Sequence, residues 1–314
     1  MLYNYFVLFI SSMKKEVVYK LLYALAMFMY GTTGCFYRFI GIPAGLLVLL
    51  RAIIGVLFIL LFMLITKHKA NFIMIKKNLL WLIFGGISIG LNWIFLFEAY
   101  NYTTVASASL INYLAPAVFI VISPFIIKEK FSSFKLIFVG IALIGVVLVS
   151  GFNNGGINPT LGIVLSILAA IGYIGILSFN KLQHGVDPYD KVVIELSSAC
   201  IVMIPYALIK TDFSTITITT ELVIYVLIFG IILTGVAYVL YLGSMEKLES
   251  IHVVILSYVE PVASVLLSVI VLHEHLSALG IIGGIMILGS TLACELIKDK
   301  KRNTEIITLE DTNG

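Results

Sequence analysis

The sequence predicts an all-α integral membrane protein with ten transmembrane helices, arranged as two inverted five-helix repeats. Hydrophobic residues make up 61% of the 314 residues and charged residues only 12%, whereas about a quarter of a soluble domain is charged. The mean hydropathy is +1.10. The apolar residues also gather in ten blocks, and the last five blocks repeat features of the first five. These observations exclude a water-soluble fold.

Each apolar block has the length that an α-helix needs to cross a hydrocarbon core of ~30 Å. Backbone polar groups in lipid must be satisfied within the segment, and the short alternating strands of a membrane barrel are absent from the sequence, so the blocks should be helices. They lie at residues 17–40, 45–66, 79–100, 102–127, 134–151, 161–180, 191–209, 221–243, 250–272 and 277–297. We assign the first repeat to 17–151 and the second to 158–297, with a glycine- and asparagine-rich break between them.

The two ends of the chain are predicted to be polar or interfacial. Residues 1–16 form an N-terminal stub, and the tail at 298–314 should be disordered. Residues 1–10 are too short to span a membrane and lack the basic region of a signal peptide. Because Met13 precedes two lysines, residues 1–12 are either a start-site extension or an interfacial stub.

The internal repeat rests on nine identities at a single ungapped offset of 145 residues. A shared pattern of this kind indicates duplication. The matching pairs are Leu82 and Leu227, Ile83 and Ile228, Phe84 and Phe229, Gly85 and Gly230, Gly90 and Gly235, Tyr113 and Tyr258, Pro116 and Pro261, Ser123 and Ser268, and Glu129 and Glu274. An odd number of helices per half requires the second half to enter the membrane upside down, which is a common construction of secondary transporters.

The distribution of basic residues predicts the orientation. With a cytoplasmic N-terminus, 17 of the 20 lysines and arginines fall in cytoplasmic segments or at cytoplasmic helix ends, and the exceptions are Arg38, Arg51 and Lys210. Cytoplasmic loops are enriched in lysine and arginine. We therefore predict a multi-pass protein of the cell inner or plasma membrane with both termini in the cytoplasm.

Several motifs together resemble the drug/metabolite transporter superfamily, in particular its ten-helix EamA type. The resemblance covers residues 17–297 and is carried by Tyr-Gly-Thr-Thr-Gly from Tyr30, Leu-Arg-Ala around Arg51, Tyr-Leu-Ala-Pro from Tyr113 to Pro116, the pair Gly140 and Gly145, and Tyr-Val-Glu-Pro from Tyr258 to Pro261. It implies a carrier that works without ATP, and many such carriers export amino acids or metabolites. The sequence has no GxxxxGK[ST] phosphate loop, which agrees with this implication.

The substrate site is predicted near the membrane midplane, where the two halves meet. Pro116 and Pro261 should kink their helices and free a carbonyl, or serve only as packing kinks. Glu260 is a carboxylate near the bilayer centre, so it should face a cavity or a partner. It either binds a cationic group or a proton, or it is a structural glutamate. Tyr113 and Tyr258 flank these positions.

Five further residues are candidates for binding or gating. Arg51 and Glu98 lie at similar depth and predict an outward-side pair or gate, with Arg38 as a rival partner. Alternatively, Arg51 snorkels to the outer interface and Glu98 lies at the water boundary. Trp93 and Tyr238 occupy repeat-related positions and either line the cavity or supply apolar bulk. Asn112, like Asn92, either lines the cavity or bonds between helices.

The sequence predicts no catalytic residue, no cofactor and no metal site. Its three cysteines are widely spaced, adjacent side chains in His273-Glu274-His275 do not share a helix face, and no HExxH or GxSxG motif is present. The expected partners are a small-molecule substrate and membrane lipid, with no nucleic acid. The glycines of residues 140–145 and 280–289 pack helices either within one chain or in a homodimer. A membrane-embedded enzyme and a non-transporting membrane component are the alternative functions.

Overall fold

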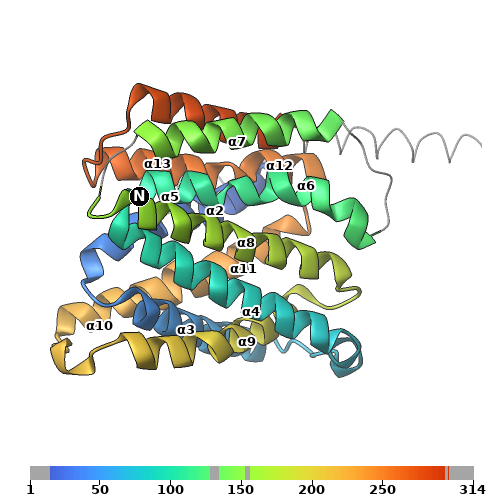
Figure 1. Cartoon of the computed structure of the whole chain (residues 1–314). Helices are drawn as coiled ribbons and strands as arrows, with labels where there is room; N and C mark the ends of the chain where they lie inside the picture. The colour runs from blue at the N-terminus through green and yellow to red at the C-terminus, as the bar shows by residue number, and fades with distance from the viewer. Residues whose placement is uncertain (1–14, 128–133, 153–155, 294–295, 297–314) are drawn as a thin grey trace, which may run out of the picture.

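The computed structural model describes residues 15–127, 134–152, 156–293 and 296. Within these residues every regular element is helical, and the helices are packed into one bundle (Figure 1). The predicted fold class is confirmed: an all-α membrane protein built from two five-helix repeats. Residues 1–14 of the predicted stub, Glu129 and the predicted tail from residue 298 lie outside the described residues.

Each half contributes five helical runs. The first half contains α2 (Lys15–Ile40), α3 (Ala44–Ile65), α4 (Phe72–Tyr102), the pair α5 (Val105–Asn112) and α6 (Leu114–Ile127), and α7 (Phe134–Phe152). The second half contains α8 (Pro159–Leu182), α9 (Pro188–Lys210), the run α10 (Thr220–Leu227), η2 (Ile228–Val236) and α11 (Ala237–Met245), the pair α12 (Ser250–Ser257) and α13 (Val259–Ile270), and a last helix at Ala278–Ala293. A 3-10 turn, η1 (Phe213–Thr215), precedes α10.

Most helix boundaries lie close to the predicted ones, and the largest difference is at α4. Its helix begins at Phe72 rather than at residue 79, because Asn71 accepts a hydrogen bond from the Met74 backbone and starts the helix within the polar segment. Seven runs are long and apolar enough to cross a membrane by themselves. The apolar part of α7 and the last helix are shorter, and α2 has charged residues at both ends.

The inversion of the halves is visible in the fourth run of each. In Figure 1 the chain passes from α5 to α6 in one direction and from α12 to α13 in the opposite direction. The halves also interleave, because α4 packs against α8 and α9, while α2 packs against α11 and α13. Sites in the interior therefore draw side chains from both repeats.

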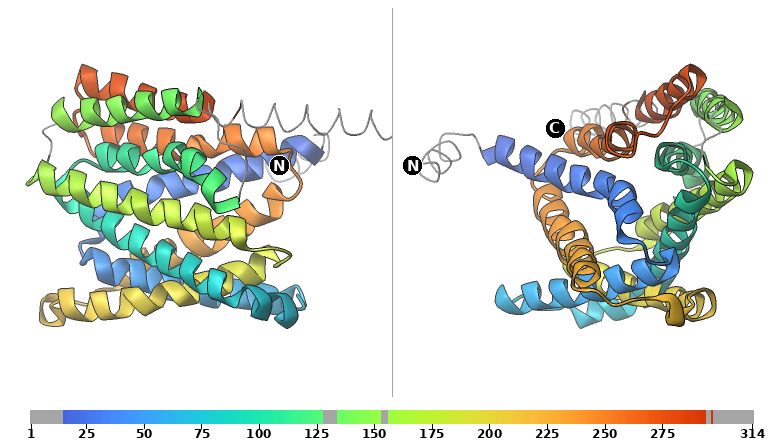
Figure 2. Two further views of the ribbon diagram at one scale, coloured as in Figure 1. Left: turned by 45° about the vertical axis from the view of Figure 1, so that its right-hand side comes forward. Right: turned by 90° about the vertical axis from the view of Figure 1, so that its left-hand side faces the viewer.

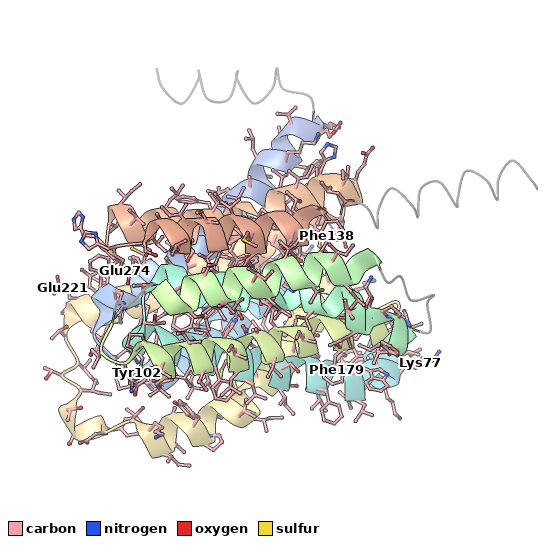
Figure 3. The ribbon with its side chains drawn as sticks, turned by 45° about the horizontal axis from the view of Figure 1, so that its top comes forward. Lys77, Tyr102, Phe138, Phe179, Glu221 and Glu274 are labelled. Atoms are coloured by element: carbon pink, nitrogen blue, oxygen red, sulfur yellow. The ribbon has the colours of Figure 1, made fainter. Side chains whose placement is uncertain are left out.

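The bundle has two ends, which we name after residues that they carry. The Glu274 end holds Tyr102, Glu221 and Glu274, and Lys77 and Phe179 lie toward the other end (Figure 3). The other end is called the His68 end, after the residue in the connection between α3 and α4.

Helix α7 and the last helix lie side by side within one chain (Figures 1 and 2). A Cβ atom on Gly145 would lie 2.6 Å from the Gly283 carbonyl oxygen, and one on Gly283 would lie 2.5 Å from the Gly145 oxygen. Only glycine permits such an approach of two backbones. Gly284 likewise faces Leu110 of the same chain. These glycines serve packing inside the monomer, and the homodimer stays a prediction.

Large apolar side chains cover the outside of the bundle. Leu64, Ile65, Leu208 and Ile209 are each more than half exposed, as are many others on α3, α7 and α9. In water so large an apolar surface would be an aggregation liability, whereas in a bilayer it faces hydrocarbon.

Candidate functional site

The fourth helix of each half is broken at the same repeat position. Helix α5 ends at Asn112 and α6 begins at Leu114, and the equivalent break separates α12 from α13 at Tyr258. Pro116 and Pro261 are the third residues of the following helices. A proline has no N–H to reach the carbonyl four residues earlier, so the helix is interrupted before the proline instead of bending at it. Discontinuous helices in inverted repeats often form midplane binding sites.

The two breaks bring together one pair of interacting side chains, Tyr113 and Glu260. Glu260 lies in the first turn of α13, where the helix dipole favours a negative charge. The Tyr113 hydroxyl, at the break of the first half, lies beside the Glu260 carboxylate and interacts with it electrostatically. Tyr113 also packs edge-on against Tyr173 of α8, with ring centroids 6.3 Å apart. Tyr258 is partly buried at the second break.

Four more tyrosines interact electrostatically with Glu260. Tyr30 of α2, Tyr100 of α4, and Tyr238 and Tyr241 of α11 are all within electrostatic range of its carboxylate. The rings of Tyr30 and Tyr238 are 5.7 Å apart in an edge-on arrangement. The Tyr30 hydroxyl is buried and has no hydrogen-bond partner among the described residues. The site is thus a phenol-lined environment around one carboxylate.

Arg51 lies in the same interior and is only 3% exposed. Its guanidinium carbon is 3.7 Å from the centroid of the Trp93 ring, and its Nε donates to the Thr234 hydroxyl at 3.2 Å. The guanidinium is within electrostatic range of Glu260. Its two Nη groups have no protein hydrogen bond in the part of the chain that the structure describes, so they are left for a ligand or water.

The position of Thr234 depends on an irregular helix. Thr234 belongs to η2, a π-helical segment whose hydrogen bonds span five residues, and its hydroxyl donates to the Phe229 carbonyl at 2.9 Å. The matching part of α4 in the first half is ordinary α-helix. π-helical insertions are frequent at functional sites. Here the insertion holds a side chain against Arg51.

The accessible surface of these side chains indicates a void beside them. Tyr30, Trp93, Tyr238 and Glu260 all keep accessible surface, although Tyr30, Tyr238 and Glu260 lie deep in the bundle. A side chain that is deep and still accessible to a water-sized probe adjoins a void of at least that size. Polar groups around such a void suit a small polar ligand.

Glu98 does not pair with Arg51, which corrects the predicted pair. Its two oxygens accept hydrogen bonds from the Tyr206 hydroxyl at 2.9 Å and from the Asn101 amide at 3.2 Å. Arg51 does not snorkel to the interface either, because the Trp93 face and Thr234 retain it inside.

Asn112 connects helices. Its side-chain oxygen accepts from the Asn92 amide at 2.9 Å, and Asn92 also donates to the Ala169 carbonyl of α8 at 2.8 Å. Both asparagines are buried. Of the two predicted roles, the structure shows the interhelical bond.

A second polar cluster fastens the Glu274 end. One Glu274 oxygen accepts from the Val105 backbone N–H at 2.8 Å and from the Ser268 hydroxyl, and the other meets Arg38 at 3.3 Å. Glu274 therefore caps α5 of the opposite half. His273 adopts a left-handed φ of 53°, which turns the chain so that Glu274 points back at the bundle. We call Glu274, Ser268, Arg38 and Val105 the Glu274 cluster.

Glu274, Thr234, Tyr30, Tyr100 and Tyr241 were not predicted as site residues from the sequence. The repeat identity of Glu274 with Glu129 was the available signal for the first. Nothing in the sequence marks Thr234, because its role depends on the π-helical turn.

The EamA-like transporter family model matches residues 18–151 and 160–294. The chain belongs to this family. It is 25% identical over 264 residues to the uncharacterized transporter YxxF of Bacillus subtilis, covering 83% of each chain. It is 24% identical to an uncharacterized transporter of Clostridium kluyveri over 65% of this chain and 68% of that one. A crystal structure with a TM-score of 0.63 and 19% identity covers 89% of this chain and 98% of its own, which shows a shared fold. The predicted family is confirmed, and this EamA-family chain is a transporter-type membrane protein.

Proposed function

We propose that this EamA-family protein is a secondary transporter that exports amino acids or related small metabolites by alternating access. The observation that carries the proposal is the pair of opposite charges, Arg51 and Glu260, that the two halves place around one internal space. A buried charge is costly unless it is compensated, and here each charge is left with capacity for a ligand.

A zwitterion matches this arrangement. Its ammonium group would bind the Glu260 carboxylate, and its carboxylate would accept hydrogen bonds from the free Nη groups of Arg51. Trp93 already covers one face of the guanidinium, so the carboxylate approaches at the edge. The surrounding tyrosines supply apolar surface and hydroxyl groups for the rest of the solute.

The Glu274 cluster supports alternating access. It joins α2 and α5 of the first half to the α13 end of the second half, so it holds the bundle shut at that end. We propose that the protein lies in the plasma membrane with both termini on the cytoplasmic side. The Glu274 end then faces outward, and the solute enters from the cytoplasm. Release outward requires the cluster to separate.

Transport suits the interior better than catalysis. A nucleophilic enzyme needs a base beside its nucleophile, and in the described interior the carboxylate and the guanidinium instead face phenols, an indole and a threonine. Such groups bind and orient a solute. We therefore propose that the protein has no catalytic activity of its own.

Counterflow in proteoliposomes tests the proposal. A panel of radiolabelled amino acids, amines and organic acids is offered with and without an imposed pH gradient. Amino acids should exchange, and amines or organic acids, which match only one of the two charges, should exchange at least about tenfold less. Arg51→Gln should lose amino-acid exchange while the protein remains folded.

Protein-free liposomes and the exposed-site variant Glu221→Gln serve as controls, since Glu221 is in the first turn of α10, away from the site. Equal exchange of amino acids by the wild type and Arg51→Gln would remove Arg51 from the site. Failure of every solute on the panel to exchange would contradict the transport proposal itself.

A further inference from the structure

Three metal-ligating side chains meet at the His68 end of the bundle. They are His68 in the connection between α3 and α4, Asp187 just before α9, and Asp190 in its first turn. One possible ligand atom from each lies within 4.8 Å of the other two. The cluster is about four helical turns along α3 from Arg51, so it is separate from the candidate transport site.

Local structure aims all three side chains at one point. After α3 ends, Lys67 adopts a left-handed φ of 54° and the His68 backbone N–H bonds to the Met63 carbonyl at 2.9 Å. This turn directs the imidazole toward α9. On the other side, Asp187 caps α9 by accepting from the Tyr189 N–H at 2.9 Å, and Asp190 follows three residues later on the same face.

The distances between the donor atoms suit one small cation. His68 Nε2 lies 3.0 Å from an Asp190 oxygen and 3.6 Å from an Asp187 oxygen. Two ligands bound at about 2.0–2.2 Å with tetrahedral or octahedral angles lie roughly 3–3.5 Å apart. An ion can therefore enter with little rearrangement, by replacing the proton that the imidazole shares with Asp190.

The charge of the cluster favours a cation. Two carboxylates face a single imidazole, and the Asp190 side chain is only 1% exposed. Among the described residues neither aspartate forms an ion pair with a lysine or an arginine. A carboxylate so deeply buried requires compensation, and one imidazole can supply at most one positive charge.

The surroundings provide further support for a bound ion. The second oxygen of Asp190 accepts from the Asn71 backbone N–H at 2.9 Å, which fixes the orientation of the carboxylate. The Asp187 side chain is 39% exposed, so water can complete the coordination. One nitrogen and two oxygen donors with open positions suit divalent first-row transition ions.

We propose that His68, Asp187 and Asp190 bind one divalent transition-metal ion, with Zn²⁺ as the probe. The ion connects the α3–α4 turn of the first half to the start of α9 in the second half. Since the ligands belong to different halves, metal binding stabilises the folded contact at the His68 end.

Zn²⁺ titration of the full-length protein tests the proposal. The protein is purified in detergent through a cleavable tag without histidines, freed of metal with a chelator, and titrated by calorimetry. One Zn²⁺ per chain should bind, and Co²⁺ should give the visible absorption of a low-symmetry site. His68→Gln and Asp187→Asn should each weaken Zn²⁺ binding at least about tenfold.

Both variants keep the hydrogen bonds of the metal-free protein. Glutamine can still donate to Asp190, and asparagine caps a helix as well as aspartate does. Their unfolding midpoints in chelator should therefore match the wild type, and only the wild-type midpoint should rise with Zn²⁺. If His68→Gln unfolds, the Zn²⁺ affinity of Asp187→Asn alone tests the proposed site.

The matched control removes the exposed histidines of the opposite end, as His273→Gln with His275→Gln. This double variant should bind Zn²⁺ as the wild type does. The proposal is overturned if the wild type binds no stoichiometric Zn²⁺, if the folded ligand variants bind equally well, or if the control loses binding.

Discussion

The fourth runs of the two halves, α5–α6 and α12–α13, share a break but differ in their surroundings. Both break at a tyrosine three residues before a proline. In the first run 78% of the most apolar 18-residue stretch is buried, and in the second only 22%. The first copy lies among other helices, whereas the second exposes Val262, Leu266 and Ile270. Duplication preserved the broken backbone of this run, and divergence changed the use of each copy.

The two runs also differ in charge, because only the second carries a carboxylate just after its break. Ala115 in the first run is fully buried, and its counterpart Glu260 faces the interior from a helix whose other side is open to lipid. A carboxylate at position 115 would be packed among helices with no space for a ligand. At position 260 it meets the Tyr113 hydroxyl and the internal space. One copy became scaffold and the other carries the ligand-binding charge.

The largest effect is expected for Glu260→Gln. It keeps the shape of the side chain and removes the charge, so the ionic hydrogen bond to an ammonium group is lost. Counterflow of amino acids should fall about 10- to 100-fold, since hydrogen bonds to charged groups contribute about 1.5–3 kcal/mol. The Glu221→Gln control should exchange normally. Normal exchange by Glu260→Gln would show that the two breaks do not differ in function.

A smaller effect is expected when the packing shared by both halves is disturbed. Gly145→Ala places a Cβ against the Gly283 carbonyl, whereas the Cβ of Gly140→Ala has no heavy atom within 4 Å. Gly145→Ala should lower the free energy of unfolding by about 1–3 kcal/mol. Gly140→Ala should leave it unchanged or raise it slightly, by up to ~1 kcal/mol. Thermal unfolding in detergent measures both, and equal midpoints would refute the close contact of α7 with the last helix.

Glu274→Gln tests whether the cluster at its end controls access. The amide keeps the shape of the side chain and weakens its bonds to Arg38 and the α5 backbone. Cys35 is 6% exposed and within electrostatic range of Glu274, so its alkylation rate reports on opening of that end. With Cys200 and Cys294 replaced by serine, the rate should rise about 5- to 10-fold, equivalent to about 1–1.4 kcal/mol. An unchanged rate would mean that this cluster does not limit opening.

The smallest effects are expected from the two prolines, which form a matched pair. Pro116→Ala and Pro261→Ala each restore an N–H that can reach back across the break. Each should change the free energy of unfolding by less than about 1 kcal/mol, because a proline in the first helical turn costs little. Only Pro261→Ala should lower exchange, by about threefold or 0.6 kcal/mol, since only the second break positions a charge. An equal loss of solute exchange in both variants would show that the two breaks have the same role in transport.

The sequence predicted much of the candidate site but fewer of its contacts. The breaks at Tyr113 and Tyr258 and the importance of Glu260 follow from proline positions and from the cost of a charge in lipid. The partner of Arg51 could not be predicted, because opposite charges at similar depth favoured Glu98 and a cation–π contact leaves no comparable pattern. In the structure Arg51 lies over the Trp93 ring, and Glu98 accepts hydrogen bonds from Tyr206 and Asn101.

The sequence alone determined the class of the protein, the number of helices and their inverted duplication. Hydropathy acts along the chain, and the cost of unsatisfied backbone in lipid leaves helices as the solution for blocks of this length. Tertiary structure decided which side chains meet: Tyr113 with Glu260, Arg51 with Thr234, and His68 with Asp190. Those contacts join residues from different halves, and their geometry depends on helix rotation and on one π-helical turn, which no local pattern encodes.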